Sequence, residues 1–210
     1  MTNTEKYIGT VKYFENLFDY INEHLFNGEL VKPVITVQVD VRNKTYGWFT
    51  LRKVWKENTA DEGNYELNMS AQQLNRPLCD TSTQCIAATL IHEMCHLYAV
   101  LNNMQDCSRS GTYHNKLFKK IAETHGLNVE CVKTIGWSYT TLKDETASLI
   151  ADFVKDNPET IIYRTPIVQG QRLKTSSTRK YVCPCCGMSV RATKQVNIMC
   201  ADCNEYMDEE

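Results

Sequence analysis

A five-residue segment, His92-Glu93-Met94-Cys95-His96, carries the H-E-x-x-H pattern. Large apolar residues recur at three- and four-residue intervals around it, which predicts an amphipathic helix over residues 86–101, capped by Asp80, Thr81 or Ser82. At roughly 100° per residue, the two histidines lie one turn apart on the same face of this helix. Two such imidazoles can bind one Zn²⁺, and a glutamate beside them can exchange a proton with water. The pattern therefore predicts His92 and His96 as zinc ligands and Glu93 as a general base.

A catalytic zinc needs a third protein ligand and an open fourth position. The metzincin extension of the pattern would place glycine at 99 and histidine at 102, but the chain has Ala99 and Asn102, which excludes that class. His114 is the best candidate, because in a helix predicted over residues 113–125 it shares the apolar face with Leu117, Phe118 and Ile121. The alternative is that His114 is a core histidine that binds no metal.

Other titratable residues near this helix fit the ligand role less well. Glu123 falls on the opposite side of the helix from His114 and is expected to face solvent. His125 lies at the helix end, where a cationic side chain would interact favourably with the helix dipole. His24 has no partner of this kind and is expected at the surface. Tyr98 and Tyr113 are near the motif in sequence, but neither can be assigned to stabilise an oxyanion.

Four cysteines near the end of the sequence have the spacing of a second zinc site. Cys183 and Cys186 form one C-x₂-C pair, and Cys200 and Cys203 form another after thirteen intervening residues. Two such pairs supply four thiolates in a tetrahedron, which predicts a closed, structural Zn²⁺ site in a zinc ribbon over residues 181–210. So short a segment cannot build a large core, so the metal must supply most of its folding free energy. Cys185 is a spare thiol that could compete with Cys186.

The remaining five cysteines show no ligand spacing, and packing is expected for each: Cys79, Cys85, Cys95, Cys107 and Cys131. The first residues lack the basic start and apolar core of a signal peptide, and no apolar run is long enough to cross a bilayer. A membrane or secreted protein is therefore not expected. A reducing, cytoplasmic location is expected, where metal ligation is a better use of cysteines than disulfides.

The rest of the chain predicts a mixed α+β fold. Apolar periodicity indicates a first helix over residues 7–25, ended by Asn27-Gly28, and a further helix over 142–155. Period-two alternation indicates strands over 35–39 and 65–69, and aromatic and β-branched residues indicate another over 45–55. Short connections favour a three-stranded antiparallel sheet. The strand over 65–69 is a candidate edge to which an extended substrate could add.

The net charge of −2 is an average over unlike regions. Between Arg164 and Ile198 there are basic residues and no acidic ones, whereas Asp202 and later residues form an acidic tip. A basic linker is predicted over residues 161–180. Lys and Arg in residues 164–198, together with the ribbon, could contact DNA phosphates, but a solvated linker explains them equally well.

The order of these features resembles the SprT-like (Spartan-type) zinc metallopeptidase family. The matching segments are residues 22–30 at the end of the first helix, the strands, residues 91–96, residues 114–118 and the terminal four-cysteine ribbon. Asn115 departs from the glycine that usually follows the third histidine, and the gap from His96 to His114 is slightly long. The resemblance implies a minimal zincin over residues 1–160, with an N-terminal helix, a three-stranded antiparallel sheet, an HExxH helix and a third-ligand helix.

The resemblance also implies an activity. It suggests a zinc metalloendopeptidase that hydrolyses peptide bonds in protein substrates, with one catalytic and one structural Zn²⁺. Eukaryotic relatives act on proteins crosslinked to DNA and are activated by DNA, so DNA-associated proteins are one expected substrate class. Two alternatives stay open: a catalytically silent zinc protein that binds nucleic acid or a protein partner, and a dedicated peptidase that cuts one regulatory protein. The sequence does not indicate an oligomeric state or a role for residues 128–180.

Overall fold

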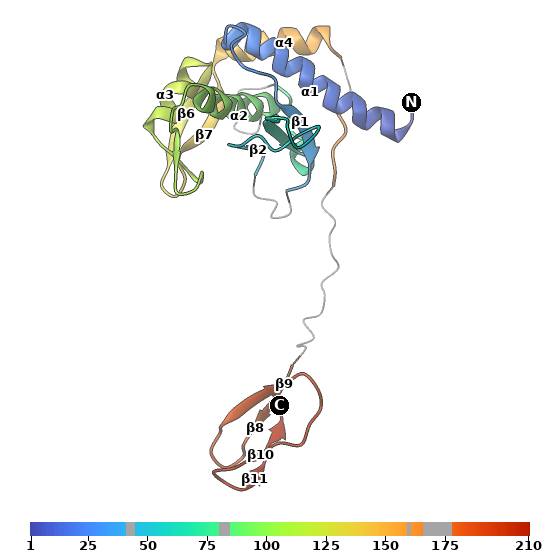
Figure 1. The fold of residues 1–210 in the computed structure, drawn as a ribbon, viewed down its shortest axis with the longest axis vertical. Helices are drawn as coiled ribbons and strands as arrows, with labels where there is room; N and C mark the ends of the chain where they lie inside the picture. Colours follow the sequence, from blue (N-terminus) through green and yellow to red (C-terminus); the bar gives the residue numbers. More distant parts are fainter. Residues whose placement is uncertain (41–44, 80–84, 159–160, 166–177) are drawn as a thin grey trace. The chain divides into compact units, whose positions relative to one another are not determined.

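The computed structural model describes residues 1–40, 45–79, 85–158, 161–165 and 178–210 (Figure 1). The chain divides into two compact units, Met1–Pro166 and Ile167–Glu210, which are described separately. The predicted capping residues Asp80, Thr81 and Ser82 lie outside the described residues, as does most of the predicted basic linker. No helix in the described ranges is long and apolar enough to cross a membrane.

Helix α1 (Asn3–Leu25) begins four residues earlier than its apolar stripe predicts. Thr2 and Glu5 form a capping box there: the Thr2 hydroxyl accepts from the Glu5 N–H, and the Glu5 carboxylate accepts from the Thr2 N–H. This box satisfies orphan donors of the first turn, so the helix starts before its buried face does. That face then packs into the core through Thr10, Tyr13, Phe14, Leu17, Phe18 and Ile21.

The first sheet contains the three predicted strands in an unexpected order. Strands β1 (Val34–Gln38) and β2 (Gly47–Phe49) both pair with β3 (Glu66–Ser70), which lies between them. The β1–β3 pair is parallel and only the β2–β3 pair is antiparallel, so the predicted all-antiparallel sheet is wrong. The predicted edge position of the strand at 65–69 is also wrong. Four of the five residues of β3 are buried, as is common for a central strand.

Helix α2 (Ile86–Leu101) is buried along almost its whole length and packs against both sheets of this unit. Its N-cap residue is Cys85, which makes no side-chain capping bond. The second sheet has the order β4-β5-β7-β6. It consists of β4 (Cys107–Ser108), β5 (Tyr113–His114), β6 (Leu127–Val132) and β7 (Gly136–Leu142), with α3 (Lys116–Thr124) between β5 and β6. The β6–β7 hairpin was not anticipated from the sequence.

The rest of the first unit closes the core on the side of α1. The short helix η1 (Ala71–Gln73) follows β3, and α4 (Asp144–Asp156) follows β7. Residues 161–165 then run back along the molecule, where the Ile162 N–H donates to Thr10 Oγ1 at 3.1 Å and the Arg164 N–H donates to the Ala71 carbonyl at 2.9 Å. The unit is thus a mixed α+β structure in which α2 is the central element.

The second unit is built from five short strands. Strands β8 (Arg179–Val182), β9 (Ser189–Ala192) and β12 (Asp208–Glu209) form one sheet in the order β12-β8-β9, and β10 (Met199–Cys200) pairs with β11 (Glu205–Tyr206). Within residues 178–210 the buried apolar residues are Tyr181, Cys183, Cys200 and Met207. A core of this size supplies little hydrophobic stabilisation.

Candidate metal centre and cleft

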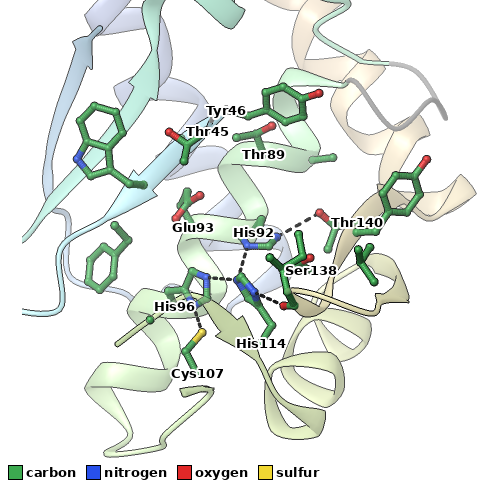
Figure 2. Close-up of a pocket in the computed structure, with 18 of the residues that line it drawn as sticks. Thr45, Tyr46, Thr89, His92, Glu93, His96, Cys107, His114, Ser138 and Thr140 are labelled. Atoms are coloured by element: carbon green, nitrogen blue, oxygen red, sulfur yellow. Dashed lines mark hydrogen bonds between the residues drawn. The ribbon is translucent and has the colours of Figure 1, made fainter. Parts of the chain in front are cut away.

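Three histidines from two elements meet on one side of α2. His92 and His96 project from successive turns of α2, and His114 is the last residue of β5 (Figure 2). The predicted helical position of His114 is wrong, because α3 starts only after it. The cause is Asn115, the N-cap of α3, whose Oδ1 accepts from the N–H groups of Leu117 and Phe118. The asparagine that departs from the family's usual glycine therefore caps the helix.

The Nε2 atoms of these histidines converge on one point. His114 Nε2 lies 3.1 Å from His92 Nε2 and 3.2 Å from His96 Nε2. Nitrogens bound 2.0–2.1 Å from one tetrahedral zinc ion would be about 3.3 Å apart. The three side chains thus have the spacing that a shared zinc ion requires.

Each Nδ1 atom has its own partner on the outer side of the cluster. His96 Nδ1 donates to Asp106 Oδ2 at 2.5 Å, and His114 Nδ1 donates to the Ile135 carbonyl at 3.3 Å. His92 Nδ1 lies 3.2 Å from Thr140 Oγ1. Because a carbonyl only accepts, the His114 bond fixes the tautomer with a lone pair on Nε2. Such outer hydrogen bonds orient metal-ligating histidines and set their basicity.

The protonation states of the cluster are unequal. Burial and the neighbouring His96 lower the pKa of His114 to about 4, and burial also holds the pKa of His92 well below its usual value. Burial acts in the same direction on His96, but its bonds to Asp106 and Cys107 and the nearby carboxylates outweigh it and raise its pKa to about 10. Any metal ion bound at His96 Nε2 therefore has to displace a proton.

Glu93 is buried beside the histidines. Burial and, to a smaller degree, the Asp106 carboxylate raise the pKa of Glu93 to about 7, although the His96 charge opposes this. Strand β2 passes directly over this side chain: a Cβ added to Gly47 would lie 2.8 Å from the Asn68 carbonyl oxygen and 3.4 Å from Glu93 Cγ. A carboxyl group with a pKa near neutrality can both accept and donate a proton at physiological pH.

These residues form the floor of a cleft of about 570 Å³. One side is formed by residues 45–51 around β2, and the other by residues 132–140 of the β6–β7 hairpin (Figure 2). Tyr46 and Tyr139 line the cleft. Tyr98 and Tyr113 do not, since the ring of Tyr98 packs against Phe26 and the ring of Tyr113 lies under Arg109.

The other histidines and Glu123 lie outside this cluster. His24 is exposed, as expected, and Glu123 pairs with Lys119 at 3.5 Å. His125 is buried and stacked on Phe26, and its Nδ1 donates to the Leu25 carbonyl at 2.6 Å. Burial lowers the pKa of His125, so the expected cation at the end of α3 is wrong.

The four cysteines of the second unit also come together. The ligand atoms of Cys183, Cys186, Cys200 and Cys203 all lie within 4.8 Å of one another. Cys186 Sγ and Cys200 Sγ are 3.7 Å apart, close to the roughly 3.8 Å that tetrahedral Zn–S bonds of 2.3 Å would give. The backbone N–H of Cys186 helps to lower the pKa of Cys183 to about 7, which favours the thiolate that binds metals. Cys185 is exposed and outside this group.

Two of the cysteines for which packing was expected behave differently. Cys131 is exposed. Cys107 lines the cleft, with its Sγ 4.0 Å from His96 Nδ1. The expectation of simple packing is therefore wrong for both. It is confirmed for the buried Cys85 and Cys95, while Cys79 is half-buried with its Sγ 3.1 Å from the Ala147 carbonyl.

The sequence model of the SprT-like family matches residues 14–135, which is more than half of the chain. The chain belongs to the SprT-like family. This family is associated with metallopeptidase-like proteins. The SprT-like match includes the three histidines and Glu93, but it ends at the residue before β7 and before the four-cysteine cluster. No curated protein and no solved structure matches the chain.

Three contributors to the histidine cluster were not identified from the sequence: Asp106, Thr140 and the Ile135 carbonyl. Asp106 offered a weak signal, because it is the first carboxylate after the H-E-x-x-H helix. Thr140 and Ile135 offered none, since their position depends on a hairpin whose pairing with β5 is a long-range contact.

Proposed function

We propose that this protein is a zinc-dependent metallopeptidase that hydrolyses peptide bonds in protein substrates. The observation that carries the proposal is the convergence of three Nε2 atoms at 3.1–3.2 Å beside a buried glutamate. His92, His96 and His114 would hold the Zn²⁺ and leave its fourth position open to the cleft. A structural zinc site has no need of a carboxylate such as Glu93, which argues against a catalytically silent protein.

The roles of the side chains follow from their positions. When bound, Zn²⁺ would polarise the scissile carbonyl and lower the pKa of a water molecule toward about 7. The Glu93 carboxylate accepts a proton from the attacking water and then donates it to the departing amine. Asp106 and Thr140 hold the rings of His96 and His92 so that their Nε2 atoms face the cleft.

The outer edge of β2, the last strand of the first sheet, is the proposed track for the substrate backbone. The Thr50 N–H donates to the Glu66 carbonyl and the Tyr46 carbonyl accepts from the Ser70 N–H, so alternate residues of this strand are used by β3. The backbone groups of Gly47 and Phe49 point to the opposite side. An extended substrate can pair with these backbone groups by strand addition. The proposed edge for the substrate is therefore β2 in place of residues 65–69.

The two units have different proposed roles. Residues 1–160 form the zincin-like peptidase domain, and residues 181–210 form a zinc ribbon in which Cys183, Cys186, Cys200 and Cys203 hold a structural Zn²⁺. Residues 161–180 are the linker. The observation that favours the ribbon is the 3.7 Å separation of the Cys186 and Cys200 sulfurs.

The first test is the substitution Glu93→Gln, which removes the proton acceptor and keeps the shape of the side chain. Cleavage of an unfolded protein such as casein should fall by about 10²–10⁴-fold, because general acid–base catalysis contributes that much. Metal analysis should still find two zinc ions per chain. Undiminished cleavage by the variant would refute the mechanism, and one zinc per chain would remove one of the two sites.

Association with DNA is a second proposal, favoured by the basic residues of 164–198. In the described part of the ribbon, Arg179 pairs with Glu209 at 3.0 Å and Lys180 pairs with Glu210, so the acidic tip neutralises two of them. Arg191 and Lys194 make no ion pair within the described residues and are the better phosphate contacts. Cleavage with and without single-stranded DNA tests this: stimulation supports DNA-associated substrates, and cleavage of one target alone supports a dedicated regulatory peptidase.

A further inference from the structure

Exposed apolar side chains gather around the cleft. Tyr46, Leu51, Ile135 and Tyr139 are large and exposed, and all four line it. Single exposed apolar residues are ordinary on a protein surface, whereas several around one concavity mark a binding groove. The four come from both sides of the cleft, two from the chain around β2 and two from the β6–β7 hairpin.

Among the described residues that line the cleft, the titratable groups of the metal centre lie on its floor, and the guanidinium of Arg76 lies behind one wall, 4.1 Å from the ring of Tyr46. Apart from Glu93 and the three histidines, every described residue that lines the cleft has an uncharged side chain at neutral pH. Arg52 and Lys53 follow Leu51 in the chain but do not line it, and Lys53 pairs with Glu62 at 2.9 Å. A charged side chain of a substrate that packed against Leu51 and Tyr139 would lose hydration, and neither of these two side chains could pair with its charge.

The apolar walls flank the place where the substrate backbone would lie. Leu51 comes two residues after Phe49, whose outward backbone groups belong to the proposed track on β2. Tyr139 lies on β7 next to Thr140, whose hydroxyl lies beside His92. Leu51 and Tyr139 both line this cleft and are both exposed, so a side chain that an extended segment on β2 directs into the cleft would meet an apolar lining.

We propose that the cleft selects an extended, unfolded segment that carries a large apolar side chain next to the bond to be cut. Leu51 and Tyr139 are its specificity-determining residues. This inference rests on the proposed peptidase function, because only a peptidase would cut the bound segment. The preference for one segment over another is a binding property and can be measured without any cutting.

The test uses the full zinc-loaded chain with Glu93→Gln, so that peptides bind without being cut. Two fluorescent peptides of unstructured sequence differ only at the central residue, which is leucine in one and lysine in the other. The leucine peptide should bind about tenfold or more tightly than the lysine peptide, because the free energy gained by burying a leucine side chain corresponds to roughly that ratio of affinities. Adding Leu51→Lys should reduce this preference at least about tenfold and favour a third peptide with glutamate at the centre. Equal affinities for the leucine and lysine peptides would overturn the proposal.

Val54→Lys in the same background is the matched control. Val54 is 53% exposed and Leu51 is 55% exposed, both follow β2, and only Leu51 lines the cleft. The preference for leucine should survive this control, and an equal loss in both variants would show that general charge, and not the cleft, decides it. Mapping the cut sites made by the unsubstituted chain separates the two proposals. If the chain prefers the leucine peptide but cuts no protein, only the proposed peptidase function is refuted. If the chain cuts proteins with no preference for apolar residues at the cut sites, only the proposed selection is refuted.

Discussion

The histidine cluster and the cysteine cluster lie in units that differ greatly in how much apolar surface they bury. The first unit has an extended core to which all four α-helices contribute, and its three histidines lie at the border of that core. In the described part of the second unit, residues 178–210, two of the four buried apolar residues, Cys183 and Cys200, are themselves proposed ligands. Because proposed metal ligands make up half of these buried apolar residues, we expect the core of the second unit to be lost when the metal is removed. The core of the first unit lies beside its ligands and does not include them, so we expect it to persist without the metal.

This difference predicts opposite roles for the two metal ions. Zinc at the cysteines is expected to be a condition for folding. Zinc at the histidines is expected to be a condition for activity, in a unit that folds without it. Four further substitutions or conditions test this contrast.

The largest expected effect is on the fold of the second unit. Replacing Cys200 with Ser removes one of four thiolates and should unfold residues 178–210, because structural zinc supplies about 10–16 kcal/mol in peptides of this kind. Amide exchange should show full loss of protection in β8–β12 and unchanged protection in α1 and α2. The control is Cys185→Ser, which should change neither protection nor zinc content. Persistent protection of β8 in the Cys200 variant would mean that the second unit does not need its metal.

The next effect is on activity without loss of fold. His114→Ala removes the third ligand and should lower peptide cleavage by at least about a hundredfold, since a zinc bound by two residues is poorly held and oriented. With both proteins free of metal, the free energy of unfolding of the first unit should change by no more than about 1 kcal/mol, because His114 is only partly buried and no bound zinc contributes to either value. Urea unfolding followed by tryptophan fluorescence measures this. A loss of several kcal/mol in the free energy of unfolding would show that the histidine cluster also supports the fold, so that the two units would not differ in this respect.

A smaller effect is expected at the carboxylate behind His96. Asp106→Asn keeps the shape of the side chain but weakens its charge-assisted bond to His96 Nδ1, which is 2.5 Å long. Zinc affinity of the histidine cluster should fall about 10–100-fold, as is usual for residues that orient metal ligands. Competition with a chromogenic chelator measures the affinity of the second, weaker zinc equivalent. An unchanged affinity would show that orientation by Asp106 does not outweigh the proton competition that Asp106 causes by raising the pKa of His96.

The smallest effect, at about tenfold for each pH unit, is a dependence of zinc affinity on pH. The pKa of His96 is raised to about 10, so the proton stays on the ring until the pH approaches that value. Zinc at Nε2 has to displace this proton, and affinity should therefore rise about tenfold per pH unit below 10 and fall as the solution is acidified. The second zinc equivalent, titrated between pH 6 and 8, reports this slope. A flat profile would mean that His96 is already neutral.

The sequence predicted the parts of the molecule that depend on local periodicity and spacing. Helix α2, the shared face of His92 and His96, and the grouping of the four ribbon cysteines are all evident from positions along the chain. The order of the strands in the first sheet was not evident from the sequence. Short connections determine the direction of each strand, but they do not determine which strand becomes central. The central place of β3 and its burial are both properties of the folded unit, which depend on contacts far apart in the sequence.

The position of His114 shows where helical periodicity misleads. Its spacing from Leu117, Phe118 and Ile121 fits an apolar helix face, yet the helix begins after it. The capping tendency of Asn115 was the signal that competed with this periodicity, and it decided the outcome. Thr140 could not be predicted at all, because no local pattern links β7 to α2.

Asn115 also binds the surrounding loop. Its N–H donates to the Asp106 carbonyl at 2.9 Å and its Nδ2 donates to the Gln105 carbonyl at 2.7 Å, while its Oδ1 starts α3. The third histidine, the carboxylate behind the second and the first turn of a helix are thereby joined into one hydrogen-bonded block. Transfer of this centre to another protein would require residues 105–118 as one segment. The histidines alone would lack the hydrogen-bonded segment that sets the distance between them.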